Sequence, residues 1–142
     1  MKLFGFFLLV VSTGLHASDN FGEWGTDCTD EGFLIQLSKE PKPLIVNDNQ
    51  IVISINSAEK SPEKMDVFFR KTLDLGAGGM NLNWKNVNQD VKVAEINVNG
   101  NEANFKWLGF FDSKKNQYFW SSDPDFVQSY AQNGIIKLQK CQ

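Results

Sequence analysis

The chain has 142 residues, a formal net charge of −3 and two cysteines. This acidic balance argues against binding to nucleic acid or to an anionic membrane, because both require a surplus of positive charge. The single histidine, His16, lies in an N-terminal stretch that is typical of a cleaved leader. Loss of that histidine excludes Ser-His-Asp and Cys-His catalysis and histidine-ligated zinc sites, so we expect no enzyme, no metal and no cofactor.

Residues 1–17 are typical of a signal peptide. Lys2 supplies a positive charge, residues 3–11 form an apolar run, and Ala17 is a small residue suited to cleavage before Ser18. The run is shorter than the ~20 residues that span a bilayer, so we expect no membrane anchor after cleavage. The alternatives are an apolar first strand or a retained anchor. We predict one exported domain, residues 18–142, in a bacterial periplasm or outside the cell.

Cys28 and Cys141 are predicted to form a disulfide, because two cysteines in an exported chain have one intramolecular pairing. The bond would close a loop containing almost the whole domain, and the chain-entropy model gives ~4–5 kcal/mol of stabilisation for such a loop. Two free thiols or an intermolecular bridge are the alternatives. The predicted disulfide would join the first strand to the last.

Alternation of apolar and polar residues, typical of half-buried strands, dominates the first half of the domain. Residues 33–37 form one apolar stripe, and residues 51–55 and 67–75 form two more. Residues 39–43 contain two prolines, and residues 57–64 are polar with a proline, so both are predicted as loops. The Asn-Asp-Asn at residues 47–49 predicts a turn.

The second half begins with a glycine-rich turn at residues 76–79. A phosphate-binding loop is the alternative there, but a dinucleotide fingerprint would need a glycine at position 81 and a following helix. Met80, Leu82 and Trp84 alternate with asparagines and predict another strand. Residues 91–120 predict a meander, in which Asn99-Gly100 suits a type I′ turn. Its return strand is expected to place one set of side chains on a single face, namely Ala103, Phe105, Trp107 and Phe111.

One helix is predicted before the last strand, residues 135–141. Asp123 can cap its N-terminus, Pro124 fits the first helical position, and Gly134 can supply a left-handed stop. The expected buried face consists of Phe126, Val127, Tyr130 and Ala131. The predicted fold is mostly β, a small antiparallel β-barrel or closed sandwich of about eight strands with one short helix before the last strand.

The segment Gly22-Glu23-Trp24 opens the β domain, and this Gly-x-Trp together with the order of elements resembles the lipocalin (calycin) superfamily. The resemblance implies a tryptophan packed across the barrel floor and covered by a basic residue of the last strand, here Lys137 or Lys140. It also implies a carrier of a small apolar ligand as one function. In size and layout the chain is also similar to the small periplasmic lysozyme inhibitors, which are disulfide-bearing barrels. Their inhibitory loop has no counterpart in this sequence.

Acidic residues crowd around the first cysteine. Asp27, Asp30 and Glu31 could bind Ca²⁺, but an EF-hand loop needs a glutamate at its twelfth position, which here is Ser38. We therefore predict a solvated acidic turn and no metal site.

Aromatic residues supply the remaining signal, because the doublets 68–69, 110–111 and 119–120 place rings on both faces of their strands. The outer rings either pack under another element or line a cavity or exposed patch that binds a ligand. The candidate binding residues are Trp24, Phe110, Phe111, Phe119 and Trp120. We predict a non-enzymatic exported binding protein, an inhibitor or interaction module that engages another protein. The alternatives are a lipocalin-like carrier of a small apolar ligand and an enzyme that uses carboxylates alone.

Overall fold

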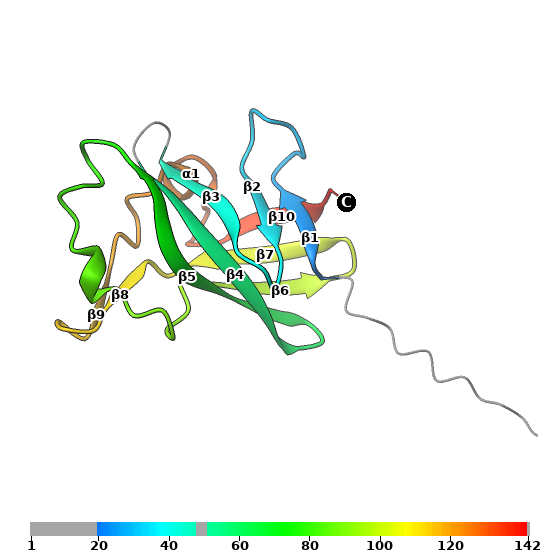
Figure 1. Cartoon of the computed structure of the whole chain (residues 1–142). Coiled ribbons are helices and arrows are strands. Elements are labelled where there is room, and N and C mark those ends of the chain that lie inside the picture. The colour runs from blue at the N-terminus through cyan, green and yellow to red at the C-terminus, as the bar shows by residue number, and fades with distance from the viewer. Residues whose placement is uncertain (1–19, 48–50, 142) are drawn as a thin grey trace, which may run out of the picture.

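A computed structural model describes residues 20–47 and 51–141 (Figure 1). The predicted signal peptide and most of the predicted turn at residues 47–49 lie outside the described residues. The described residues form ten strands, one 3-10 helix and one α-helix. In chain order these are β1 (Gly22–Gly25), β2 (Leu34–Leu37), β3 (Lys42–Asn47), β4 (Ile51–Ser61), β5 (Lys64–Leu75), η1 (Trp84–Asn86), β6 (Ala94–Asn99), β7 (Glu102–Trp107), β8 (Phe110–Asp112), β9 (Gln117–Phe119), α1 (Asp125–Tyr130) and β10 (Ile136–Lys140).

Eight strands form an antiparallel sheet that curls into a nearly closed barrel, in the order β2-β1-β10-β7-β6-β5-β4-β3 (Figure 1). β1 and β10, the first and last strands, pair directly, with Trp24 opposite Lys140. β8 and β9 form a separate two-stranded hairpin. The prediction of a mostly β, closed antiparallel fold with one short helix before the last strand is confirmed.

Of the two segments predicted as loops, the first keeps residues 39–41 as a connection and the second is largely strand. Pro43 lies in β3, a terminal strand of the sheet, where a missing N–H is tolerated. β4 continues through residues 57–61 and β5 begins at Lys64, so the second predicted loop shrinks to the turn around Pro62. Pairing of main-chain groups across a hairpin does not require apolar side chains, which is why this polar stretch is a strand.

Residues 76–93 form an excursion between β5 and β6. The glycine-rich turn is present, but the predicted strand through Met80, Leu82 and Trp84 is wrong, because this segment consists of turns and η1. The Trp84 ring stacks on Phe69, with centroids 5.7 Å apart, and meets the edge of Phe110 at 4.9 Å. The apolar periodicity therefore reflects side chains that dock on the barrel from an irregular segment.

The turns after β6 and after α1 differ from the prediction. Asn99 pairs with Glu102, so the residues at the tip of that hairpin are Gly100 and Asn101. Of these two, Gly100 alone has a positive φ, 64°, and the type I′ turn predicted at residues 99–100 is wrong. Gly134 has the predicted left-handed conformation, with a φ of 79°, but α1 ends earlier, at Tyr130. Asn133 also has a positive φ, 54°, so an Asn-Gly pair forms the turn before β10.

Gly109 interrupts the predicted meander between β7 and β8, with a φ of 108°. A side chain at this position would collide with the Phe119 carbonyl, so only glycine fits. The interruption shifts the alternation by one residue. Phe110, and not the predicted Phe111, consequently joins Phe105 and Trp107 in the core.

α1 begins one residue later than predicted, after Pro124. Its N-terminus is not capped by Asp123. The N–H of Asp125 donates to Oδ1 of Asn47, 2.9 Å away at the end of β3. The buried face is also smaller than predicted, because Phe126 is buried but Tyr130 is 39% exposed. The helix is therefore held by one buried ring and by a side chain distant in sequence.

Candidate functional site

The predicted binding aromatics do not form an exposed patch. Trp24 and Phe110 are both 0% exposed. The outward ring of Phe111 packs edge-on against Tyr118 at 5.1 Å, and Phe119 packs on Phe110 at 5.7 Å. Each of these rings therefore has partners within the chain, which agrees with the interpretation that the outer rings of the doublets pack under other elements.

Trp120, the last candidate, is partly buried. Its carbonyl accepts a hydrogen bond from Nε1 of Trp107 at 2.9 Å. The outward ring of another doublet, Phe68, lies under the guanidinium of Arg70, 5.6 Å from the ring centroid. The aromatic excess is thus used mainly for packing.

A connected set of aromatic rings fills much of the barrel interior. Phe33 stacks on Phe126 at 4.5 Å, and Phe126 meets the edge of Trp107 at 5.3 Å. Trp107 in turn meets the edge of Phe110 at 5.4 Å, and Phe105 closes on Phe33 at the same distance, 5.4 Å. Large rings in contact at these distances leave little space for a ligand between them.

Trp24 lies in the core beside the last strand, as its resemblance to the lipocalin tryptophan implies. The Lys140 ammonium lies 5.0 Å from the Trp24 ring centroid, a cation–π distance, and donates to the Phe21 carbonyl at 2.6 Å. Trp24 Nε1 donates to the Asn20 carbonyl at 2.9 Å. Of the two lysines proposed to cover the tryptophan, Lys140 does so, whereas Lys137 is exposed.

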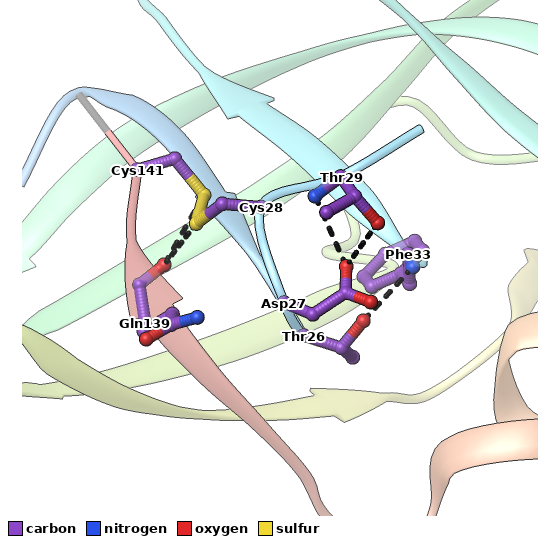
Figure 2. The surroundings of a disulfide bond; sticks show 7 residues. All are labelled: Thr26, Asp27, Cys28, Thr29, Phe33, Gln139 and Cys141. Atoms are coloured by element: carbon purple, nitrogen blue, oxygen red, sulfur yellow. Dashed lines mark hydrogen bonds between the residues drawn. A yellow bond between two sulfur atoms is a disulfide. The ribbon is translucent and has the colours of Figure 1, made fainter. Parts of the chain in front are cut away.

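The predicted disulfide is present between Cys28 and Cys141, whose Cα atoms are 5.5 Å apart (Figure 2). Cys28 follows β1 and Cys141 follows β10, so the bond covers the end of a strand pair that is already hydrogen-bonded. The N–H of Cys141 also donates to the Glu23 carbonyl at 2.8 Å. The first and last strands of the barrel are thereby clamped covalently.

Figure 2 also shows why the turn after β1 is ordered. Oδ1 of Asp27 accepts hydrogen bonds from the N–H and the hydroxyl of Thr29, at 3.0 and 2.9 Å. Oγ1 of Thr26 accepts from the N–H of Phe33 at 3.0 Å. Asp27 therefore holds the turn, and the described residues contain no group of three side chains suited to a metal ion.

β2 and β3 border the one interface at which the described barrel strands do not pair. Residues 38–41 join these two strands, and beside this connection the N–H of Ser57 donates to the Ser38 carbonyl at 2.7 Å. α1 bridges the other end. It contacts β3 through Asn47 and reaches the β1–β2 turn through the Tyr130 hydroxyl, which donates to the Glu31 carbonyl at 3.3 Å. We call this interface the β2–β3 seam.

A groove of about 850 Å³ lies over the β2–β3 seam. Its apolar lining includes Ile45, which is 56% exposed, and Tyr130 at its helical end. The lining also carries four carboxylates, and no lysine or arginine occurs among the described residues that form it. These carboxylates belong to Glu23, Asp30, Glu31 and Asp125. The groove therefore combines exposed apolar surface with a lining that carries carboxylates but no lysine or arginine.

A separate ion cluster lies on the paired β5–β6 side of the barrel. Lys92 contacts Glu95 at 2.7 Å and Asp66 at 3.5 Å. The hydrogen bond between Lys92 and Glu95 lowers the pKa of the Glu95 carboxyl and raises the pKa of the Lys92 ammonium. Burial raises the pKa of Tyr118, whose hydroxyl donates to the Lys92 carbonyl at 2.9 Å. Because these groups satisfy one another, the cluster stabilises the fold and offers no free binding group.

The chain matches no protein-family model, no curated protein and no solved structure at a significant level. Among the helices of the described residues, none has the length and apolar character needed to cross a membrane.

Sequence reasoning did not identify the groove. The prolines of residues 39–43 predict a loop, and no apolar stripe of the sequence includes Ile45. A useful signal was present, since Pro43 next to the β-branched pair Ile45-Val46 is typical of an edge strand. The distance between β2 and β3 could not be obtained from that signal.

Proposed function

We propose that this protein is an exported, non-enzymatic binding protein that engages another protein through the β2–β3 groove. The observation that carries the proposal is Ile45, a large apolar side chain 56% exposed in a groove edged by carboxylates. Exposed apolar surface with a polar rim is typical of protein-binding sites. The disulfide and the Trp24–Lys140 contact support the proposal, because a rigid scaffold loses little conformational entropy on binding.

The second candidate is a lipocalin-like carrier of a small apolar ligand. The cation–π contact between Lys140 and Trp24 favours it, since that arrangement is what the resemblance implies. The rings that fill the interior, Phe33, Phe105, Phe110 and Phe126, weigh against it. A carrier of this kind would have to bind outside the barrel or displace several of these rings.

The test uses a photo-crosslinking amino acid at position 45 and, as a control, at Asn104 on the exposed face of β7. After irradiation of the cells that produce the protein, we expect a protein adduct of defined mass at position 45 and none at position 104. The adduct should weaken in the double variant Asp30→Asn/Glu31→Gln. Equal adducts at both positions, or none at position 45, would contradict the proposal.

Native mass spectrometry of the protein purified from the same cells separates the two candidates. A co-purifying small apolar mass would favour the carrier. A bare chain together with the position-45 adduct would favour the interaction module.

A further inference from the structure

We propose that the occupant of the groove is an extended, basic segment of a partner protein, which adds as a strand to the free edge of β2. This inference rests on the proposed function, since it specifies how the partner is held. Strand addition to an exposed sheet edge is a general mode of peptide recognition, in which main-chain hydrogen bonds supply affinity. Three features of the β2–β3 seam support it.

The first feature is the direction of the β2 main chain. The N–H of Thr26 donates to the Phe33 carbonyl at 3.0 Å, so Phe33 faces β1. In an antiparallel pair, residues alternate between facing the partner strand and facing away from it. Ile35 therefore also faces β1, and the N–H and carbonyl groups of Leu34 and Gln36 face the seam.

The second feature is that the seam-facing side of this segment already makes a main-chain hydrogen bond just after β2 ends. Ser38 lies two residues after Gln36, so its main-chain groups face the same way. Its carbonyl accepts a hydrogen bond from the N–H of Ser57 at 2.7 Å. Among the described residues the pairing stops there, because β2 and β3 do not form a ladder. An added strand would continue along β2 from the point where this hydrogen bond ends.

The opposite edge is less suited to strand addition. Pro43 removes one main-chain donor from β3, as is common on edges that do not pair. β3 and its neighbour β4 contribute apolar side chains to the groove instead, from Ile45 and Val52. We therefore assign main-chain pairing to β2 and side-chain contact to β3.

The third feature is charge. Glu23 is partly buried beside β2, and Asp30 and Glu31 are on the turn that precedes it, with no lysine or arginine among the described lining residues. Lysine or arginine side chains on the added strand would complement these carboxylates. A second copy of this chain is a poorer occupant, since its formal charge is −3.

The probe is a synthetic peptide of alternating lysine and valine, with about six residues so that it can pair along a short strand. β2 has four residues, so a longer peptide would add no further pairs. Two isomers carry N-methyl groups on the main-chain nitrogens of either the lysines or the valines. Each isomer blocks one edge of the extended peptide, because alternate N–H groups point the same way.

We expect the unmethylated peptide to bind, one methylated isomer to bind at least about tenfold more weakly, and the other to bind nearly as well. Isothermal calorimetry with the mature, disulfide-bonded protein measures all three. Equal binding by the two isomers would overturn strand addition. No binding of the unmethylated peptide at about 1 mM would overturn it as well.

Two pairs of variants locate the contact. Gln36→Pro removes a seam-facing N–H and should weaken binding about tenfold, whereas Gln36→Ala keeps the N–H and should not. Asp30→Asn/Glu31→Gln should weaken binding and reduce its salt dependence, whereas Glu59→Gln/Glu102→Gln, outside the groove, should change neither. Circular dichroism and urea midpoints identify any variant that fails to fold. If both pairs behave alike, the assignment to this edge is overturned.

Failure of this inference can be distinguished from failure of the proposed function. A specific adduct at position 45 with equal binding by both isomers would leave the function standing and remove the strand-addition mode. Loss of both the adduct and peptide binding would remove both. A dimer in analytical ultracentrifugation that Gln36→Pro dissociates would make a second copy the occupant and overturn the inference.

Discussion

The barrel treats two of its strand interfaces in opposite ways. At the β1–β10 interface, strand pairing, the Cys28–Cys141 disulfide and the contact of Lys140 with Trp24 act together. At the β2–β3 seam, the described strands do not pair, carboxylates gather without basic neighbours in the lining, and a short helix bridges one end. Only β1 and β2 themselves separate the two.

This difference shows how a small barrel can keep one strand edge, that of β2, free to pair with a partner. An unpaired edge weakens a sheet and invites unwanted pairing. Here β1, the neighbour of β2, is fixed on its other side by the interface that carries the disulfide. The seam can therefore stay open without loosening the barrel, and the following experiments test that division.

The largest effect is expected from removing the disulfide. Cys28→Ser/Cys141→Ser deletes a cross-link between residues 113 positions apart and should lower the free energy of unfolding by ~4–5 kcal/mol. Urea unfolding, with the reduced wild-type protein as the matched control, measures it. A loss below ~1 kcal/mol would mean that strand pairing alone fixes β1 to β10.

The stability of the β2–β3 seam should depend on the ring of Phe126 in α1. Phe126→Ala removes a side chain that is 5% exposed and stacked on Phe33, and should cost about 3 kcal/mol. Val127→Ala, at a partly buried position on the same helix, should cost about 1 kcal/mol. Hydrogen exchange should speed up in β3 with Phe126→Ala, because α1 contacts that strand. Unchanged exchange in β3 would show that α1 does not support the seam.

A smaller effect is expected from the lysine over the tryptophan. Lys140→Met keeps an apolar stem but removes the ammonium near Trp24, and should cost about 1 kcal/mol. Lys137→Met, on the exposed face of the same strand, should change stability by less than ~0.5 kcal/mol. If the two variants behave alike in thermal unfolding, the cation–π contact contributes nothing measurable to the clamped interface.

The smallest effect concerns a charged pair beside β5 and β6, two strands that pair with each other, and it serves as a reference for the other three effects. The pKa of Glu95 is lowered by its hydrogen bond from Lys92, so its contribution to stability is present above the unfolded-state pKa. That contribution disappears as the pH falls through the lower, folded-state pKa. Because the Glu95 side chain is 38% exposed, Glu95→Gln should cost below ~1 kcal/mol near neutral pH.

The same pair makes the opposite prediction at high pH. The pKa of Lys92 is raised, so its contribution is constant below the unfolded-state pKa and disappears as the pH rises through the higher, folded-state pKa. Urea unfolding of the wild type and Glu95→Gln at about pH 3, 7 and 11.5 measures the difference. A stability difference that grows on acidification would contradict the assigned direction.

The sequence alone determined the features that depend on residue type and period. Two cysteines have one intramolecular pairing, and alternating apolar stripes predicted β2, β4, β5 and β7. Trp24 in the core, a lysine of the last strand above it (Lys137 or Lys140) and a short helix before β10 were also predictable, because each has a local pattern or a family resemblance. Apart from the disulfide and the lysine over Trp24, these are properties of one strand or one turn at a time.

Only the tertiary structure decided the features that depend on distant segments. The cap of α1 comes from Asn47, 78 residues earlier, so Asp123 offered a misleading local signal. Trp84 alternates like a strand residue, yet it docks from an irregular segment on Phe69 and Phe110. The β2–β3 groove is the clearest case, since its lining comes from strands, a turn and a helix that no sequence period connects. Which strand edges remain unpaired is decided only by the pairing of all the other strands in the sheet.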